Sequence, residues 1–167
     1  MILDRFCGSI LPPVLTTKSN MLRVKFFTDV PDPKNGFKAR VSISTCGGMY
    51  RSAAGVISSP GFGNNGAYPA NSQCDYRILT NPGSSITVQF KSLDLPDTYE
   101  NCSEVDHVTV YSILPNENGG EDLLSPLGDF CGDKIPNVIQ SSTNEILIRF
   151  KTFAHQSDYS GFMLKYS

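Results

Sequence analysis

The 167-residue sequence contains no apolar run that approaches the roughly 18 residues needed to cross a bilayer. It also lacks a signal-peptide pattern at its start, because Asp4 and Arg5 interrupt what would be the apolar segment. An extracellular protein needs such a signal. If the protein is extracellular, this absence therefore predicts that the chain is a piece of a longer polypeptide.

Charge is scarce and nearly balanced. Charged residues make up 18% of the chain, whereas an average globular domain has roughly 25%. The net charge of −2 gives no indication of the basic surface that nucleic-acid binding requires. Glycine and proline are plentiful instead, at 14 and 11 residues, which is typical of a β protein with many turns.

Motifs of zinc and catalytic sites are missing as well. None of the five cysteines forms a CxxC pair, and only two histidines are present, so we expect no structural zinc site. No GxSxG or HExxH motif occurs. His107 adjoins Asp106, but neighbours on a strand point to opposite faces, so the two are poorly placed for a catalytic triad. We predict that the protein is not an enzyme.

The strongest positive signal is an internal repeat. Eight residues recur in order 124 positions later, as the pair Cys7 and Cys131 illustrates. The first set is Phe6, Cys7, Gly8, Pro12, Val14, Asn20, Phe26 and Thr28, and the second is Phe130, Cys131, Gly132, Pro136, Val138, Asn144, Phe150 and Thr152. Gly36-Phe37 recurs as Gly161-Phe162 after one extra residue. Because this period is that of a whole domain, we expect residues 1–45 to be the C-terminal third of one domain. Residues 46–167 should be a complete second domain.

Period-two alternation predicts strands in both copies. Apolar residues alternate with polar ones at Ile86, Val88 and Phe90. Similar strand-like runs are Asp75–Thr80, Val108–Val110, Ile146–Phe150, Phe162–Tyr166, Leu22–Phe26 and Phe37–Val41. Gly-, Pro- and Asn-rich turns separate them. The pattern predicts an all-β, antiparallel sandwich or barrel.

The cysteine pattern alone leaves the disulfide pairing open. Four of the five cysteines lie in the expected complete domain, and four cysteines allow three pairings. The alternative is that they are reduced core thiols of a cytosolic protein.

Several motifs in order resemble a CUB domain over all of residues 46–167, and residues 6–43 resemble the last third of one. The motifs are Cys46-Gly-Gly, Gly55-Val-Ile-Ser-Ser-Pro60-Gly-Phe, Ala67-Tyr-Pro69, Cys74-Asp-Tyr76, Val88 to Leu95, Phe130-Cys131-Gly132 and Tyr159-Ser-Gly-Phe162. The resemblance implies a jelly-roll-like antiparallel β-sandwich with the disulfides Cys46–Cys74 and Cys102–Cys131. Cys7 repeats Cys131, so we expect Cys7 to be unpaired in this chain.

Many CUB domains bind calcium, so the resemblance implies a candidate calcium site. Tyr68 and Asp106 stand at matching positions, and oxygen ligands suit the ion. The two other carboxylate positions fall near Pro96 and Phe153, which supply no side-chain ligand.

Three carboxylates, Asp94, Asp97 and Asp158, are candidates to compensate through a shifted loop. The alternative is that Tyr68 and Asp106 hydrogen-bond to each other or to nearby backbone, with no ion. In the first copy, Asp29 keeps the carboxylate that Phe153 replaces.

The sequon Asn101-Cys102-Ser103 predicts a glycosylation site on a surface loop. Occupancy is open, because the middle residue is a cysteine that the resemblance places in a disulfide.

Abutting CUB domains resemble the tandem arrays of cubilin-type endocytic receptors. This implies a non-enzymatic, extracellular module that binds protein ligands through its loop apices, within a secreted or cell-surface protein and beside other CUB domains. We expect neither nucleic-acid binding nor membrane insertion. The alternatives are a tolloid-type protease, in which the module is non-catalytic, and a neuropilin-like receptor. Candidate ligand contacts are Asp97, Tyr99, Glu100 and residues 116–121.

Overall fold

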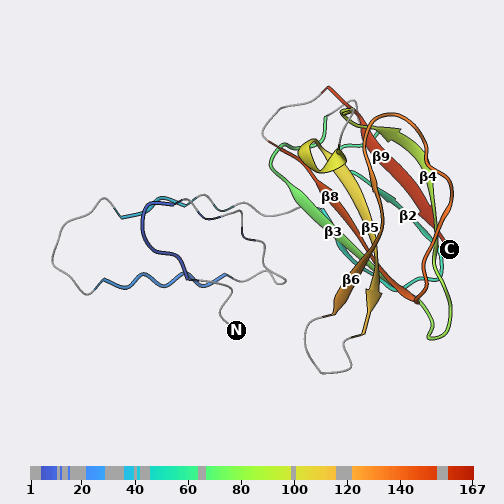
Figure 1. Ribbon diagram of the computed structural model, residues 1–167, viewed down its shortest axis with the longest axis horizontal. Coiled ribbons are helices and arrows are strands. Elements are labelled where there is room, and N and C mark those ends of the chain that lie inside the picture. The colour runs from blue at the N-terminus through green and yellow to red at the C-terminus, as the bar shows by residue number, and fades with distance from the viewer. Residues whose placement is uncertain are drawn as a thin grey trace. The chain divides into compact units, whose positions relative to one another are not determined.

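The computed structural model describes a chain of two compact units, Met1–Val41 (unit 1) and Ser42–Ser167 (unit 2) (Figure 1). The described residues are 5–10, 12, 15, 22–28, 36–39, 41, 46–63, 67–98, 101–115, 122–153 and 158–167. Each unit is considered by itself.

The described residues of unit 2 form nine β-strands and one short helix. The strands are β1 (Gly48–Tyr50), β2 (Gly55–Ser58), β3 (Gln73–Leu79), β4 (Thr87–Asp94), β5 (His107–Leu114), β6 (Leu123–Phe130), β7 (Ile139–Gln140), β8 (Glu145–Lys151) and β9 (Gly161–Tyr166). The 3₁₀ helix η1 covers Cys102–Glu104. Among the described residues no helix is long and apolar enough to cross a membrane.

The strands form two layers that pack face to face (Figure 1). One sheet has the order β1-β3-β8-β5-β6 and the other the order β2-β9-β4-β7. The paired strands are antiparallel, apart from β1 and β3, whose parallel pairing the sequence did not predict. The predicted all-β, jelly-roll-like sandwich is confirmed.

Alternation along the strands sends one set of side chains into the core. On β4, Val88 and Phe90 are buried, whereas Gln89 and Lys91 between them are exposed. Phe162 on β9 lies at the centre, with ring centroids 5.2 Å from Phe150, 6.2 Å from Phe90 and 6.3 Å from Tyr76. Because β8 and β3 belong to the other sheet, the contacts with Phe150 and Tyr76 join the two layers. Burying each aromatic side chain contributes about 1.5–3 kcal/mol.

Unit 1 differs from what alternation predicts. No strand occurs among its described residues, which include 22–28, 36–39 and 41, so the strands predicted over Leu22–Phe26 and Phe37–Val41 are wrong where the structure describes them. A strand is held by hydrogen bonds to a neighbouring strand. Every described residue of unit 1 is exposed, and the burial that stabilises such pairing is missing.

Two disulfides join distant parts of unit 2. Cys46 is bonded to Cys74 and Cys102 to Cys131, with sequence separations of 28 and 29 residues. These are the two pairs that the family resemblance implies. Cys7 is a free, exposed cysteine.

Replacing Cys102 and Cys131 together by alanine should lower the free energy of unfolding of unit 2 by about 3–4 kcal/mol. The reason is that the unfolded chain regains the entropy of the loop that the disulfide closes. Urea denaturation followed by circular dichroism measures the loss. Cys7→Ser is the matched control, since its thiol is exposed and unbonded. An equal loss in the control would contradict the prediction.

Candidate functional site

The candidate site is the loop apex, defined here as residues 67–72, 94–98, 101–106, 131–133, 152–153 and 158–160. The strand registers bring these segments to one end of the sandwich. Gln73 and His107 both lie opposite Lys151, and Asp94 lies opposite Gly161. Loops that are far apart in the sequence therefore meet at this end (Figure 1).

Asp106 connects three of these segments. Asp106 is 5% exposed, and each of its carboxylate oxygens accepts a hydrogen bond. The Tyr68 hydroxyl donates to Oδ2 at 2.9 Å, and the Phe153 backbone N–H donates to Oδ1 at 2.7 Å. A buried carboxylate needs such partners, because an unsatisfied one is costly. Tyr68 and Asp106, both singled out from the sequence, are thus in direct contact.

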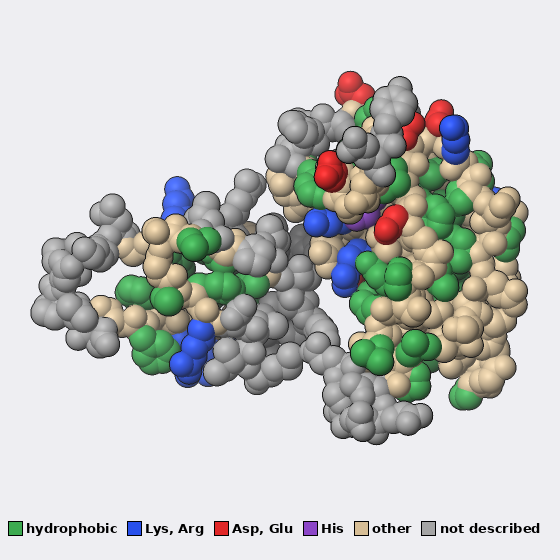
Figure 2. All heavy atoms as spheres, in the orientation of Figure 1, with side chains coloured by type: hydrophobic (Ala, Val, Ile, Leu, Met, Phe, Trp, Pro, Cys, Tyr) green, Lys and Arg blue, Asp and Glu red, His purple; other side chains and the backbone are tan. Residues whose placement is uncertain are grey.

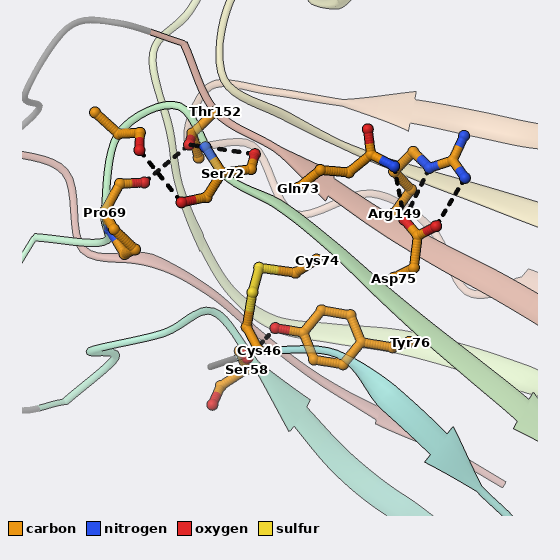
Figure 3. Close-up of a disulfide and its surroundings, with 11 residues drawn as sticks. Cys46, Ser58, Pro69, Ser72, Gln73, Cys74, Asp75, Tyr76, Arg149 and Thr152 are labelled. Atoms are coloured by element: carbon orange, nitrogen blue, oxygen red, sulfur yellow. Dashed lines mark hydrogen bonds and ion pairs between the residues drawn. A yellow bond between two sulfur atoms is a disulfide. The ribbon is translucent and has the colours of Figure 1, made fainter. Parts of the chain in front are cut away.

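Thr152 provides a second connection at the apex, beside the Cys46–Cys74 disulfide (Figure 3). Its hydroxyl donates to the Pro69 carbonyl at 2.8 Å and accepts from the Ser72 N–H at 2.8 Å. The Thr152 N–H also donates to the Ser72 carbonyl at 2.8 Å. Sequence reasoning assigned no role to Thr152, although its repetition of Thr28 was the available signal.

The Phe153 side chain makes two further contacts at the apex. Its ring centroid lies 6.3 Å from that of His107, and Lys151 Nζ lies 4.8 Å from it, within range of a cation–π contact. His107 Nδ1 lies 2.6 Å from the Val105 carbonyl oxygen. The apex is therefore held together by apolar and backbone contacts as well as by the carboxylate.

The outer face of the larger sheet carries an ion pair near this end. Arg149 Nε and Nη2 each donate to the Asp75 carboxylate at 2.8 Å (Figure 3). The hydrogen bonds that Arg149 donates to the Asp75 carboxylate raise the pKa of Arg149, and burial opposes this in part. Such a partly exposed pair fixes side-chain geometry more than it stabilises the fold.

The apex shows no triad geometry at His107. Asp106 is engaged by Tyr68 and Phe153, and the His107 ring is directed at a backbone carbonyl. Ser112, a nearby serine that could complete a triad, is five residues along the same strand from His107, so its side chain points to the opposite face. These three residues do not converge on one point.

The sequence model of the CUB domain matches residues 1–41 and 46–166. The chain belongs to the CUB domain family. The "Cubilin homolog" of Drosophila melanogaster is 31% identical over 171 residues, and human "Neuropilin-2" is 31% identical over 161. The alignments cover 99% and 90% of this chain. The chain spans only 4% and 16% of these two relatives.

A solved CUB structure has the same fold. It is the "MASP-1 CUB2 domain bound to Ca2+", which superposes with a TM-score of 0.58 and is 27% identical, over 72% of this chain and 97% of that one. The resemblance read from the sequence motifs is confirmed. CUB domains are generally non-catalytic binding modules.

Most of the described candidate calcium ligands are engaged in hydrogen bonds within the protein. Both oxygens of Asp106 are already engaged by protein donors. Asp94 Oδ2 accepts from the N–H and hydroxyl of Ser160, and Asp97 Oδ1 accepts from the Thr98 N–H. Within the described ranges no three His, Cys, Asp or Glu side chains form a metal-binding group. Asp158 is exposed, and Asp29 lies outside the described residues.

Of the remaining predicted site residues, some are described by the structure and others lie outside the described ranges. Asn101 is exposed, and its Oδ1 caps η1 by accepting from the Ser103 N–H at 3.1 Å. Asp97 is also exposed. Tyr99, Glu100 and residues 116–121 lie outside the described residues.

Tyr68→Phe should lower the free energy of unfolding by about 1.5–3 kcal/mol, because a buried hydrogen bond to a carboxylate is lost. Chemical denaturation of the full chain measures this. Tyr159→Phe is the matched control on the same apex, since Tyr159 is 40% exposed. If the two variants have the same free energy of unfolding, the Tyr68–Asp106 hydrogen bond does not stabilise the fold as predicted.

The midpoint of thermal unfolding should be the same in millimolar calcium as in EDTA, since Asp106 is satisfied by Tyr68 and Phe153. Calorimetric titration provides a second measurement. Micromolar calcium binding that Asp106→Asn abolishes would contradict this expectation.

Proposed function

We propose that the chain is part of a cubilin-like, multi-CUB endocytic receptor. In it, residues 46–167 are a complete CUB domain and residues 1–45 the C-terminal third of another. The carrying observation is that two CUB matches adjoin, with only residues 42–45 between them. The similarity to the cubilin homolog extends over 99% of the chain and so includes both matches.

The proposed role is to engage extracellular protein ligands through the loop apex, without catalysis. Several side chains there are exposed and acidic, including Asp97, Glu104, Asp133 and Asp158, and Figure 2 shows acidic side chains at this end of unit 2. The hydrogen bonds of Asp106 and Thr152 hold the loops beneath them. A preorganised surface loses less entropy on binding, and its acidic rim favours ligands with a basic patch.

An extracellular or cell-surface location is part of this proposal. The two disulfides support it, since such bonds persist in oxidising compartments. Asn101 is exposed and is followed by Cys102-Ser103, so we include its glycosylation in the proposal.

The neuropilin-2 similarity favours a second candidate, a neuropilin-like receptor; a tolloid-type protease with non-catalytic CUB domains is a related one. The sequence encoded on either side of these residues discriminates among them. Further CUB repeats support the cubilin-like receptor. Coagulation-factor-like domains support the neuropilin type, and an HExxH-bearing domain supports the protease.

Immobilised full chain should capture serum proteins, and Asp97→Lys should weaken that capture about tenfold by reversing a charge of the apex. Biolayer interferometry measures the affinity for the captured protein. Asp122→Lys is the matched control, because Asp122 is exposed and lies beyond Leu114, at the other end of β5. Equal effects of both variants, or no capture, would count against the proposal.

A further inference from the structure

The outer face of the smaller sheet carries a row of exposed side chains outside the loop apex. Val56 on β2 lies opposite Lys165 on β9, and Lys165 lies opposite Gln89 on β4. All three are exposed, whereas the residues that follow them on their strands are buried. The row therefore crosses three adjacent strands on the solvent side of the sheet (Figure 1).

A groove of about 540 Å³ runs over this row. Lys165, Gln89 and Thr87 line it together with two exposed valines, Val56 and Val138, which are 54% and 56% exposed. Val56 belongs to β2, at one edge of the sheet, and Val138 directly precedes β7, at the other edge. Three inter-strand spacings, roughly 14 Å in total, separate β2 from β7. We call this feature the valine–lysine groove.

The longer polar side chains on this face offer hydrogen-bond donors. Lys91 Nζ donates to Gln89 Oε1 at 2.5 Å, which leaves the two amide N–H bonds of Gln89 as donors. Among the described residues neither Lys91 nor Lys165 forms a salt bridge, whereas Arg77 and Arg149 on the other sheet both pair with carboxylates. The groove thus presents positive charge between two apolar ends.

The valine–lysine groove is separate from the loop apex. Thr87 begins β4, and Asp94, which belongs to the apex, ends it. A strand of eight residues spans roughly 23 Å. Asp94 is the single carboxylate in the four strands of this sheet, and it accepts hydrogen bonds from Ser160 at the apex end. No carboxylate of these strands is therefore paired with Lys165.

We propose that the valine–lysine groove binds an extended, acidic segment of a partner protein. Its carboxylates contact Lys165, Lys91 and Gln89, because unpaired cations and amide donors favour an anionic ligand. Its apolar side chains contact Val56 and Val138. In an extended peptide, the first and fifth residues lie on the same side and roughly 13 Å apart, which matches the separation of the two valines.

The apolar ends favour a peptide over a purely ionic ligand. A sulfated glycan or a lipid headgroup would use the lysines and leave Val56 and Val138 exposed to water. A peptide with apolar residues at its first and fifth positions and acidic residues between them uses both kinds of contact. This second binding surface goes beyond the proposed role of the loop apex.

The test titrates the full, isotope-labelled chain with two acetylated and amidated peptides, Leu-Glu-Asp-Glu-Leu and its neutral counterpart Leu-Gln-Asn-Gln-Leu. The chain carries a Gly-Ser-Gly-Ser extension after Ser167, which lines the groove, so that the terminal carboxylate does not compete. The acidic peptide should bind at least about tenfold more tightly, because hydrogen bonds to charged groups are the stronger ones. In NMR spectra the amide signals of Val56, Gln89 and Lys165 should shift. Equal binding of the two peptides, no binding, or shifts confined to the apex would overturn the proposal.

Substitutions of a single charge test the role of Lys165. Lys165→Gln should weaken binding of the acidic peptide about tenfold, and Lys165→Arg should retain it because the cation is kept. Lys151→Gln is the matched control, since it removes the same charge from an exposed position on β8, in the other sheet. If Lys165→Gln and Lys151→Gln weaken binding equally, the peptide responds to net charge alone and the proposal is wrong.

A second pair of variants tests the apolar ends. Val138→Ser should weaken binding of the acidic peptide at least about threefold, because apolar burial is lost. Ile135→Ser is the matched control, since Ile135 is 55% exposed on the same segment and does not line the groove. Equal effects of these two variants would contradict the proposed apolar contacts.

Heparin fragments and phosphatidylserine vesicles are titrated in parallel with the acidic peptide. Binding of either in preference to the peptide would identify a different occupant and overturn the proposal. Ligand capture by the loop apex is tested with Asp97→Lys and does not involve Lys165, so failure here is distinguishable from failure of the proposed function.

Discussion

The structure depends on one constraint: a strand buries its apolar face only when strands flank it and a second sheet lies in front of it. Phe162 is 0% exposed because β2 and β4 flank β9 and because Phe150 and Tyr76 face it from the other sheet. Phe37, at the repeated position of unit 1, is 61% exposed. The type of side chain sets how much free energy its burial can contribute. The neighbouring strands decide whether that side chain is buried.

The pairing of the strands and the packing of the two sheets also form the loop apex. Strand registers bring Tyr68, Asp106 and Phe153 to one end although they are distant in sequence. Asp106 is then satisfied by a hydroxyl and a backbone N–H. Because Phe153 contributes its backbone, an apolar side chain is compatible with a position where the family resemblance implies a carboxylate. Protein hydrogen bonds support the loops that we propose to contact ligands.

Much of the fold could be predicted from local pattern, and the exceptions have physical causes. Alternation predicted β4, β8 and β9, although Ile146, Leu147 and Ile148 of β8 are all buried. It missed β6, which contains Pro126 and Gly128; a proline is tolerated there because β6 lies at the edge of its sheet. It was wrong for Leu22–Phe26, which have the right alternation but no flanking strand among the described residues of unit 1. At the candidate site, sequence singled out Tyr68 and Asp106 but missed Thr152, whose partners are set by the β3–β8 register.

The sequence by itself determined the repeat, the β class, the CUB family and the absence of a long apolar span, because each follows from residue order and composition. Only the tertiary structure decided that Asp106 accepts hydrogen bonds from Tyr68 and Phe153, and that β1 runs parallel to β3. Only it showed that one copy of the repeated aromatic pair is buried and the other exposed. The physical reason is that hydrogen bonding and burial are properties of neighbours in space, which the order of residues along one chain does not specify.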